Sequence, residues 1–214
     1  MAEHRLPCPV IGAWARHSVA GMLPSLGGAS VQVQTGPPCA AGDDLLGRAA
    51  VLPDILGANL KLVVCGTAAG SRSAQLNRYY AGPGNKFWSL LAELGFTPHR
   101  LLPEEAHLLP SFGIGLTDLL KGQSGADSEI DFGRVGSSSL TRKMLALQPR
   151  VLCFNGKRAA QEYQRSKAVD YGLQAGHIGS TQVCVAPSTS AAANGSWDAS
   201  YWRELSELVT APES

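Results

Sequence analysis

The stretch from Gly66 to Asn85, GTAAGSRSAQLNRYYAGPGN, contains residue types that could hold a flat ring. It follows the apolar run KLVVC, and a strand that ends in a glycine-rich turn exposes backbone N–H groups to a ligand. Tyr79 and Tyr80 could stack on a nucleic-acid base, at roughly 1–3 kcal/mol per base. Asn85 could bind a planar base or hold a water molecule. The tyrosines could instead pack in the core and Asn85 could begin a helix, and the sequence leaves these alternatives open.

A second polar loop, Pro187-Ser188-Thr189-Ser190, follows the apolar run TQVCVA and is rich in hydroxyl groups. Hydroxyl and N–H groups on a tight turn suit a phosphate. Ser188 lacks the G-x-S-x-G surroundings of a hydrolase nucleophile, and no acidic partner for His177 is evident. The first stretch also lacks the signatures of a P-loop and of a dinucleotide site. A serine or nucleotide hydrolase is therefore only a minor alternative.

The composition is that of an ordinary globular protein: 44% of the 214 residues are hydrophobic, 16% are charged, and the net charge is +1. The cysteines form no C-x-x-C pair and the histidines no H-x-x-x-H or H-x-H, so we predict neither metal nor cofactor. Cys65, Cys153 and Cys184 lie in strand-like runs and are predicted to be buried thiols, as in a reducing cytoplasm. No apolar run approaches the roughly 18 residues that span a bilayer, so we expect no membrane partner.

Residues 1–48 differ from the rest of the chain in composition and in hydrophobic pattern. Turn-forming stretches such as TGPPCAAGDD dominate them, and little hydrophobic period is visible. We predict a poorly ordered N-terminal extension over 1–48, with at most a short strand at SVQVQ, followed by a single domain over 49–214.

Within that domain, apolar runs typical of strands alternate with helical patterns. The predicted strands are KLVVCG, GIGLTDLL, RVLCFNGK and TQVCVAPSTS; the predicted helices are NKFWSLLAELGF, SLTRKMLALQ, RAAQEYQRS and ASYWRELSELV. This alternation predicts an α/β protein, a three-layer αβα sandwich with a central parallel four-stranded sheet. A ligand should then bind at the loops that follow the carboxyl ends of the strands.

Several of these segments together resemble the uracil-DNA glycosylase superfamily: LPDILGANLKLVVCGTAAG, YYAGPGNKFWSLLAELGF, GIGLTDLL, CFNGK and IGSTQVCVAPSTSA. The resemblance covers about residues 51–209 and is closest to the mismatch-specific uracil-DNA glycosylase and thymine-DNA glycosylase family. YYAGPGN-x-FW and FNGK are its most specific motifs. It implies a parallel four-stranded sheet between helices, DNA as the partner, no cofactor, a monomer, and work at the bacterial nucleoid.

The resemblance also implies roles for individual residues. Those placed around the flipped base are Gly66, Thr67, Ala68, Gly70, Tyr80 and Asn155, with Tyr80 stacking on it. Those placed against the DNA are Ser73, Lys157, Pro187, Ser188, Thr189 and Ser190, with Ser188 holding a phosphate oxygen. Basic side chains near these loops could neutralise further phosphates: Arg72, Arg78, Lys86, Lys157 and Arg158.

One departure from the family pattern concerns the catalytic residue. The family's first motif usually reads Gly-Ile-Asn-Pro-Gly, and its Asn positions the attacking water. Here Ala68 occupies that place, and its methyl group cannot hold a water. Other branches also lack this Asn and draw a polar side chain from nearby, so we predict Asn85 as the water-positioning residue. Asp118 is the second choice: it is a stronger base, suited to poorer leaving groups, although it could merely cap the next turn.

The sequence therefore predicts a monofunctional DNA glycosylase of base-excision repair, with uracil as the first substrate and hypoxanthine, xanthine or mismatched thymine second. Holding the departing base with N–H donors and excluding water can lower much of the barrier. Because Ala68 replaces the usual catalytic residue, the alternative is an inactive module of this fold that only binds DNA or damaged bases. The small residues from Ser190 to Ala192 replace a bulky wedge, which predicts less help with base flipping or weaker dependence on the opposite base.

Overall fold

The computed structural model describes residues 50–134 and 137–211. The predicted N-terminal extension over 1–48, including a strand at SVQVQ, lies outside the described residues. Among the described residues no helix is both long enough and apolar enough to cross a membrane.

A central sheet organises the described part of the chain, with the strands in the order β2-β1-β3-β5-β4. Strands β1, β2, β3 and β5 run parallel to one another, and β4 pairs antiparallel with β5 at one edge. The strands span Leu62–Ala69 (β1), Ile114–Ser124 (β2), Val151–Asn155 (β3), Gly172–Ile178 (β4) and Thr181–Ala186 (β5). The α/β sandwich and its four parallel strands are confirmed, and β4 adds a fifth strand that the sequence analysis did not anticipate.

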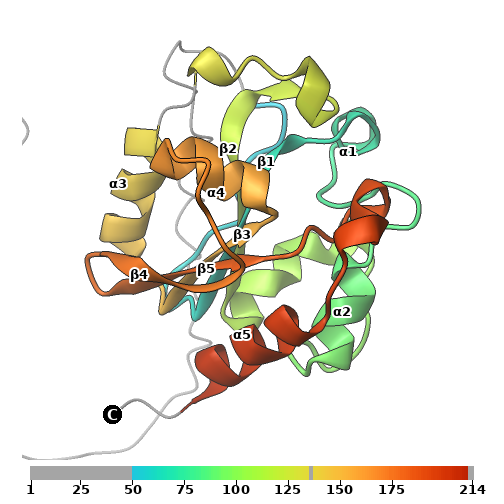
Figure 1. The fold of residues 1–214 in the computed structure, drawn as a ribbon. Coiled ribbons are helices and arrows are strands. Elements are labelled where there is room, and N and C mark those ends of the chain that lie inside the picture. The colour runs from blue at the N-terminus through green and yellow to red at the C-terminus, as the bar shows by residue number, and fades with distance from the viewer. Residues whose placement is uncertain (1–49, 135–136, 212–214) are drawn as a thin grey trace, which may run out of the picture. The chain divides into compact units, whose positions relative to one another are not determined.

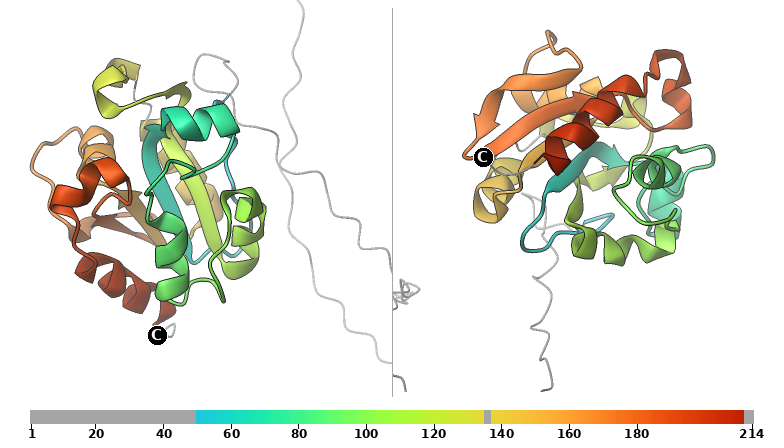
Figure 2. Two further views of the ribbon diagram at one scale, coloured as in Figure 1. Left: turned by 90° about the vertical axis from the view of Figure 1, so that its right-hand side faces the viewer. Right: turned by 90° about the horizontal axis from the view of Figure 1, so that it is seen from below.

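Helices cover both faces of this sheet (Figure 1). They span Ser71–Leu76 (α1), Phe87–Glu93 (α2), Ser137–Leu147 (α3), Lys157–Gln164 (α4) and Ser200–Thr210 (α5), with 3₁₀ turns at Pro103–Phe112, Asp127–Glu129, Phe132–Arg134 and Ala191–Ser196. Helices α2 and α5 lie side by side in both views of Figure 2, and the Ser206 hydroxyl of α5 donates to the carbonyl of Leu94 just after α2.

The buried residues separate according to the face of the sheet on which they lie. Because side chains alternate along a strand, Leu62 and Val64 of β1 pack with Phe87 of α2 and Trp202 of α5. Their neighbours in β1 pack on the other face, with Met144 of α3 among others. Near-continuous apolar strands are what a sheet buried on both faces requires.

The segment before β1 covers the outer edge of β2. Ile55 and Leu116 exchange backbone hydrogen bonds of 2.9 and 2.7 Å, and the N–H of Val51 donates to the carbonyl of Lys121 at 2.7 Å. A Cβ atom at Gly115 would lie 2.8 Å from the side chains of Leu56 and Leu60, so glycine is needed for this close approach. The edge is thereby protected, and Asp54 is brought against β2.

Three cysteines lie in the strands, as predicted. Cys65, Cys153 and Cys184 are buried free thiols in β1, β3 and β5. Burial raises the pKa of Cys65 and of Cys153 well above the usual value. They therefore act as small apolar side chains in the core.

A side-chain hydrogen bond from a buried tryptophan holds the loop after β5. A second buried tryptophan, which makes no such bond, allows its contribution to stability to be measured. The Nε1 of Trp202 donates to the carbonyl of Pro187 at 2.9 Å, whereas the Nε1 of Trp88 has no partner among the described residues. Each Trp→Phe change removes similar apolar contact, but only Trp202→Phe removes a buried hydrogen bond. We expect Trp202→Phe to lower the free energy of unfolding by about 1–2 kcal/mol more than Trp88→Phe, measured by urea denaturation. Equal losses would mean that this bond contributes nothing.

Candidate functional site

A cavity of about 680 Å³ opens at the carboxyl ends of the parallel strands. Its walls come from residues within the segments 66–73, 80–85, 118–127, 155–158 and 188–196, together with Tyr171. Of the residues that the sequence analysis placed around the base, against the DNA or in catalysis, only Pro187 does not line this cavity, and its carbonyl is held by Trp202. Tyr79, Arg78 and Lys86, which it considered for stacking or for phosphates, do not line the cavity either. The topology therefore gathers the predicted residues at the edge of the sheet where ligands bind in α/β proteins.

Gly66 and Asp118 are register partners in the parallel pair β1–β2. A Cβ atom built at Gly66 would lie 2.6 Å from Oδ1 of Asp118 and 3.7 Å from the hydroxyl of Tyr80. The carboxylate thus lies directly over the glycine backbone at the floor of the cavity. The sequence analysis left open that Asp118 merely caps the next turn. Asp118 lies within β2 and does not begin a turn.

The surroundings of Asp118 raise its pKa above that of an exposed aspartate, but not above neutral pH. The pKa of this carboxyl is raised to about 6: burial raises it most and the charge of Asp54 adds to this, whereas Lys121, Tyr79 as a hydrogen-bond donor, and Lys143 lower it. At neutral pH most molecules therefore carry an ionised Asp118 that can accept a proton. A buried carboxylate with a pKa close to the working pH is the profile of a general base.

Tyr80 has the geometry of a stacking residue. Its ring lies on the ring of Phe87, with 4.0 Å between centroids and 31° between planes, so one face is covered, and the residue lines the cavity. Its φ of 51° is unusual for a tyrosine and sets the direction in which the ring projects. The hydroxyl is buried without a hydrogen bond of ordinary geometry to any described residue. Burial raises the pKa of Tyr80 well above the usual value, and the Asn155 side chain opposes this shift.

Asn85 lines the cavity and also bonds to the start of α2, whose N-cap residue is Lys86. Its Oδ1 accepts a hydrogen bond of 3.0 Å from the N–H of Phe87, the first residue of α2. This bond satisfies one of the free donors at the helix start, so the capping alternative of the sequence analysis is realised. One of the two lone pairs of this amide oxygen is therefore already engaged.

Asn155 and Thr189 are joined by two hydrogen bonds. The Nδ2 of Asn155 donates to Oγ1 of Thr189 at 3.0 Å, and the N–H of Thr189 donates to Oδ1 of Asn155 at 2.9 Å. Both residues are buried. The end of β3 thus holds the Pro187–Ser190 loop in place, which leaves Asn155 one amide hydrogen for a ligand.

Lys86 fastens the Gly-Pro-Gly turn to the second loop. Its N–H donates to the carbonyl of Thr189 at 2.9 Å, its ammonium group contacts Oδ1 of Asn194, and it lies 5.0 Å from the ring centroid of Trp197. The ammonium group of Lys86 is therefore engaged within the protein. The two loops form one preassembled wall of the cavity.

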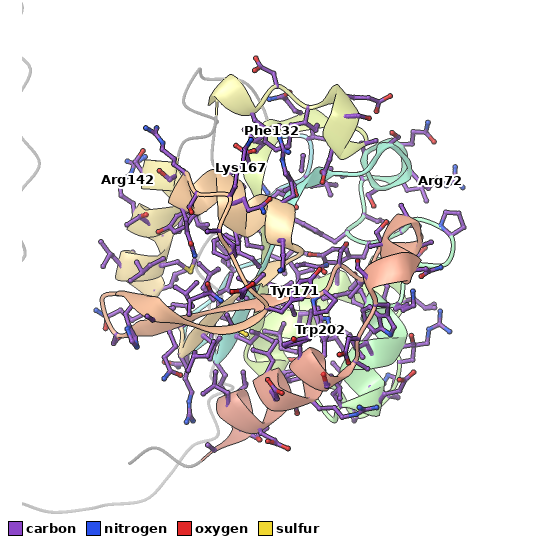
Figure 3. All side chains as sticks on the ribbon, in the orientation of Figure 1. Arg72, Phe132, Arg142, Lys167, Tyr171 and Trp202 are labelled. Carbon is purple, nitrogen blue, oxygen red and sulfur yellow. The ribbon has the colours of Figure 1, made fainter. Side chains whose placement is uncertain are left out.

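The other basic side chains near the cavity differ in their availability. Arg78 pairs with Glu104, Arg158 with Glu162, and Lys157 lies 3.5 Å from Asp170 and over the ring of Tyr171. Arg72 of α1 lines the cavity and has no charged or hydrogen-bonding partner among residues 50–134 and 137–211; Figure 3 shows it at the edge of the molecule. Arg72 is therefore the basic side chain best placed to meet an incoming anion.

Sequence reasoning missed two features of the site. Asp127 lines the cavity, where burial raises its pKa, while Arg158 and a hydrogen bond from Thr67 lower it. Lys121, Asp54 and Tyr79 form a charged group beneath Asp118. A lysine inside the strand-like run TDLLKG was the one available signal. Within the described residues, His, Cys, Asp and Glu form no cluster of three that could hold a metal.

Comparisons with known proteins agree with this architecture. The family model described as the uracil DNA glycosylase superfamily matches residues 53–206. A solution NMR structure of a candidate uracil DNA glycosylase from Methanosarcina acetivorans is similar in fold, with a TM-score of 0.55 and 23% sequence identity. The match covers 75% of this chain and 97% of that chain.

The raised pKa of Asp118 predicts a pH-dependent cost in stability. Since the folded state holds this proton more tightly than the unfolded chain, whose usual pKa is 3.8, the free energy of unfolding falls as pH rises from about 4 to above 6. The whole effect amounts to about 3 kcal/mol. Asp118→Asn cannot ionise, so we expect it to be more stable than the wild type at pH 7.5 but not at pH 4, measured by urea denaturation.

Asp54→Asn is the matched control. Burial alone would raise the pKa of Asp54, but Lys121 and Lys143 hold it below its usual value, so its ionised form stabilises the fold. This variant should be less stable than the wild type at pH 7.5. The interpretation of Asp118 is wrong if Asp118→Asn changes stability equally at both pH values.

Proposed function

Because the chain belongs to the uracil-DNA glycosylase superfamily, we propose that it is a monofunctional DNA glycosylase of base-excision repair that hydrolyses the N-glycosidic bond of a deaminated base. Uracil is the first substrate; hypoxanthine, xanthine or mismatched thymine comes second. The motifs YYAGPGNKFW and FNGK favour the mismatch-specific branch. The observation that carries the proposal is the buried Asp118 carboxylate over Gly66, on the floor of a cavity that also holds the exposed face of Tyr80.

In this mechanism the base leaves the helix stack and enters the cavity, where it stacks on Tyr80. As the bond between the sugar C1′ and the base nitrogen breaks, its electron pair goes to the base and positive charge develops on the sugar. Backbone N–H groups of Gly66–Gly70, at the carboxyl end of β1, stabilise the departing base anion. Asp118 takes a proton from a water molecule, whose oxygen bonds to C1′, and the free base is later protonated from solvent.

The geometry supports Asp118 over Asn85 as the residue that activates the water. The Asn85 oxygen already accepts a hydrogen bond from Phe87, whereas the Asp118 carboxylate is held ready at the cavity floor. This reverses the order of preference that the sequence suggests. Asn85 then has the role of shaping the turn beside the base.

A hydrolytic route, rather than attack by an amine, fits the cavity. Lys157 is the amine in the cavity wall, and its ammonium group lies against Asp170 and the ring of Tyr171. An amine nucleophile would leave a covalent imine with the sugar. Borohydride should therefore trap no protein–DNA adduct.

The alternative is an inactive module that binds DNA or damaged bases. Ala68 motivates it, because the family's usual water-positioning Asn is absent. Turnover separates the two functions, since a module binds DNA in a salt-sensitive way but releases no base.

The first test is single-turnover base release from matched oligonucleotides that carry uracil, hypoxanthine, xanthine or a G·T mismatch, both single-stranded and paired. We expect uracil release by the wild type, and a loss of about 10²-fold or more in Asp118→Asn. Asn85→Ala should slow the release of uracil only about tenfold, because it removes a hydrogen bond at the start of α2 and leaves the catalytic carboxylate in place. If only Asn85→Ala abolishes release, the assignment of Asp118 is wrong; if the wild type releases no base, the module is favoured.

Two glycines of the first motif offer a matched pair. Gly66→Ala places a methyl group where Oδ1 of Asp118 lies, whereas a Cβ at Gly70 meets no described atom within 4 Å. We expect base release to fall by about 10-fold to 100-fold in Gly66→Ala and to change less than about threefold in Gly70→Ala. Circular dichroism would check that both variants fold, and equal rates in the two would contradict the placement of Asp118.

A further inference from the structure

A group of charged side chains lies beneath the cavity without lining it. The ammonium group of Lys121 in β2 is 2.7 Å from Oδ1 of Asp54, and Lys143 of α3 pairs with the other carboxylate oxygen. The hydroxyl of Thr117 donates to Oδ1 of Asp54 at 2.7 Å. The Lys121 side chain is only 8% exposed. Burying an ion pair costs several kcal/mol of desolvation per ion, so apolar side chains would serve stability as well.

Tyr79 connects this group to Asp118. The ammonium group of Lys121 donates to the Tyr79 hydroxyl at 2.8 Å. Because a lysine can only donate, the Tyr79 oxygen must accept this bond, and its single proton is left for another acceptor. We infer that this acceptor is Asp118, because Tyr79 acts on the Asp118 carboxyl as a hydrogen-bond donor that lowers its pKa. The contacts link Asp54 to Lys121 and Lys121 to Tyr79, and the inferred bond from Tyr79 extends this chain to Asp118.

We propose that Tyr79 and Lys121 are positioning residues, which hold the Asp118 carboxylate over Gly66 in the orientation that accepts a proton from water. The inference rests on the proposed function of Asp118 as the base. Tyr79 is 3% exposed and does not line the cavity, so it acts through Asp118 and not on the substrate. Tyr80, its neighbour in sequence, faces the base.

The groups that act on the charge of Asp118 come from several elements. Lys121 of β2, Tyr79 after α1 and Lys143 of α3 favour its ionised form, whereas burial and Asp54, from the segment before β1, oppose it. Cys65 of β1 and Tyr80 are also close enough for their own ionisation to be opposed by Asp118. Removing Tyr79 or Lys121 should therefore shift the acid limb of activity toward higher pH.

The experiment combines two readouts on full-length wild type, Tyr79→Phe, Lys121→Met and Lys143→Met. One is the pH midpoint of the Asp118 side-chain carboxyl ¹³C resonance, assigned by comparison with Asp118→Asn. The other is the single-turnover rate of uracil release from pH 5 to 9, with the half-saturating protein concentration measured separately.

Tyr79→Phe removes only the hydroxyl group. We expect both pH midpoints to rise by about one unit, the rate at pH 7 to fall about tenfold with partial recovery at pH 9, and the half-saturating concentration to stay within about twofold. Lys121→Met tests the same chain if Tyr79→Phe fails to fold. Lys143→Met is the matched control, since it removes a cation from the same Asp54 but acts less on Asp118, and it should shift the midpoints least.

The outcomes separate this inference from the proposed function. If the variants raise the pH midpoint of the Asp118 carboxyl, and the pH midpoint of the rate rises with it, both the inference and the proposed function are supported. An active wild type whose Tyr79→Phe and Lys121→Met variants keep the wild-type midpoints and rates overturns the inference alone. If the wild type releases no base, the proposed function fails, and the carboxyl midpoints then decide by themselves whether Tyr79 and Lys121 hold Asp118.

Discussion

The approach of the Asp118 carboxylate to the backbone of Gly66 is the contact on which the rest of the site depends. It exists because β1 and β2 pair in parallel with these two residues in register and because position 66 carries no side chain. A slip of one residue would turn Thr117 or Leu119 toward this face instead. The sheet therefore does more than support the loops: its register places the ionisable group on the cavity floor.

The same contact creates an electrostatic conflict that the surrounding residues moderate. Burial disfavours the charge of Asp118, and Lys121, Tyr79 and Lys143 restore part of its stability. The resulting pKa of about 6 lies between that of an exposed carboxyl, which is too weak a base, and that of a fully isolated one, which would stay protonated at neutral pH. Burying this charge lowers the stability of the fold, and the two large apolar clusters, one on each face of the sheet, offset that loss.

The sequence predicted the layers of the fold and the four parallel strands, because apolar periodicity and strand-end glycines are local signals. Most of the residues that it proposed for the site do line the cavity, but they are only about half of its lining. It did not predict β4, whose exposed middle residues weaken the apolar pattern. Neither the bond from the Phe87 N–H to Asn85 nor the burial of Asp118 within β2, on which our preference for Asp118 rests, is visible in a linear pattern. The link from Asp54 to Tyr79 joins residues far apart in the chain and required the tertiary structure.

Ala68 then has a physical explanation that does not require loss of activity. An asparagine in the first motif orients water with a neutral amide, whereas a carboxylate can also accept the proton, so the two solutions need different surroundings. A carboxylate entering from β2 needs open space above Gly66, and it needs cations beneath it to remain ionised. Both conditions are met here, by the missing side chain at Gly66 and by Lys121 with its hydrogen-bonded Tyr79. In the proposed mechanism the neighbouring strand supplies the catalytic carboxylate, so position 68 only has to line the wall of the cavity, for which a small apolar side chain suffices.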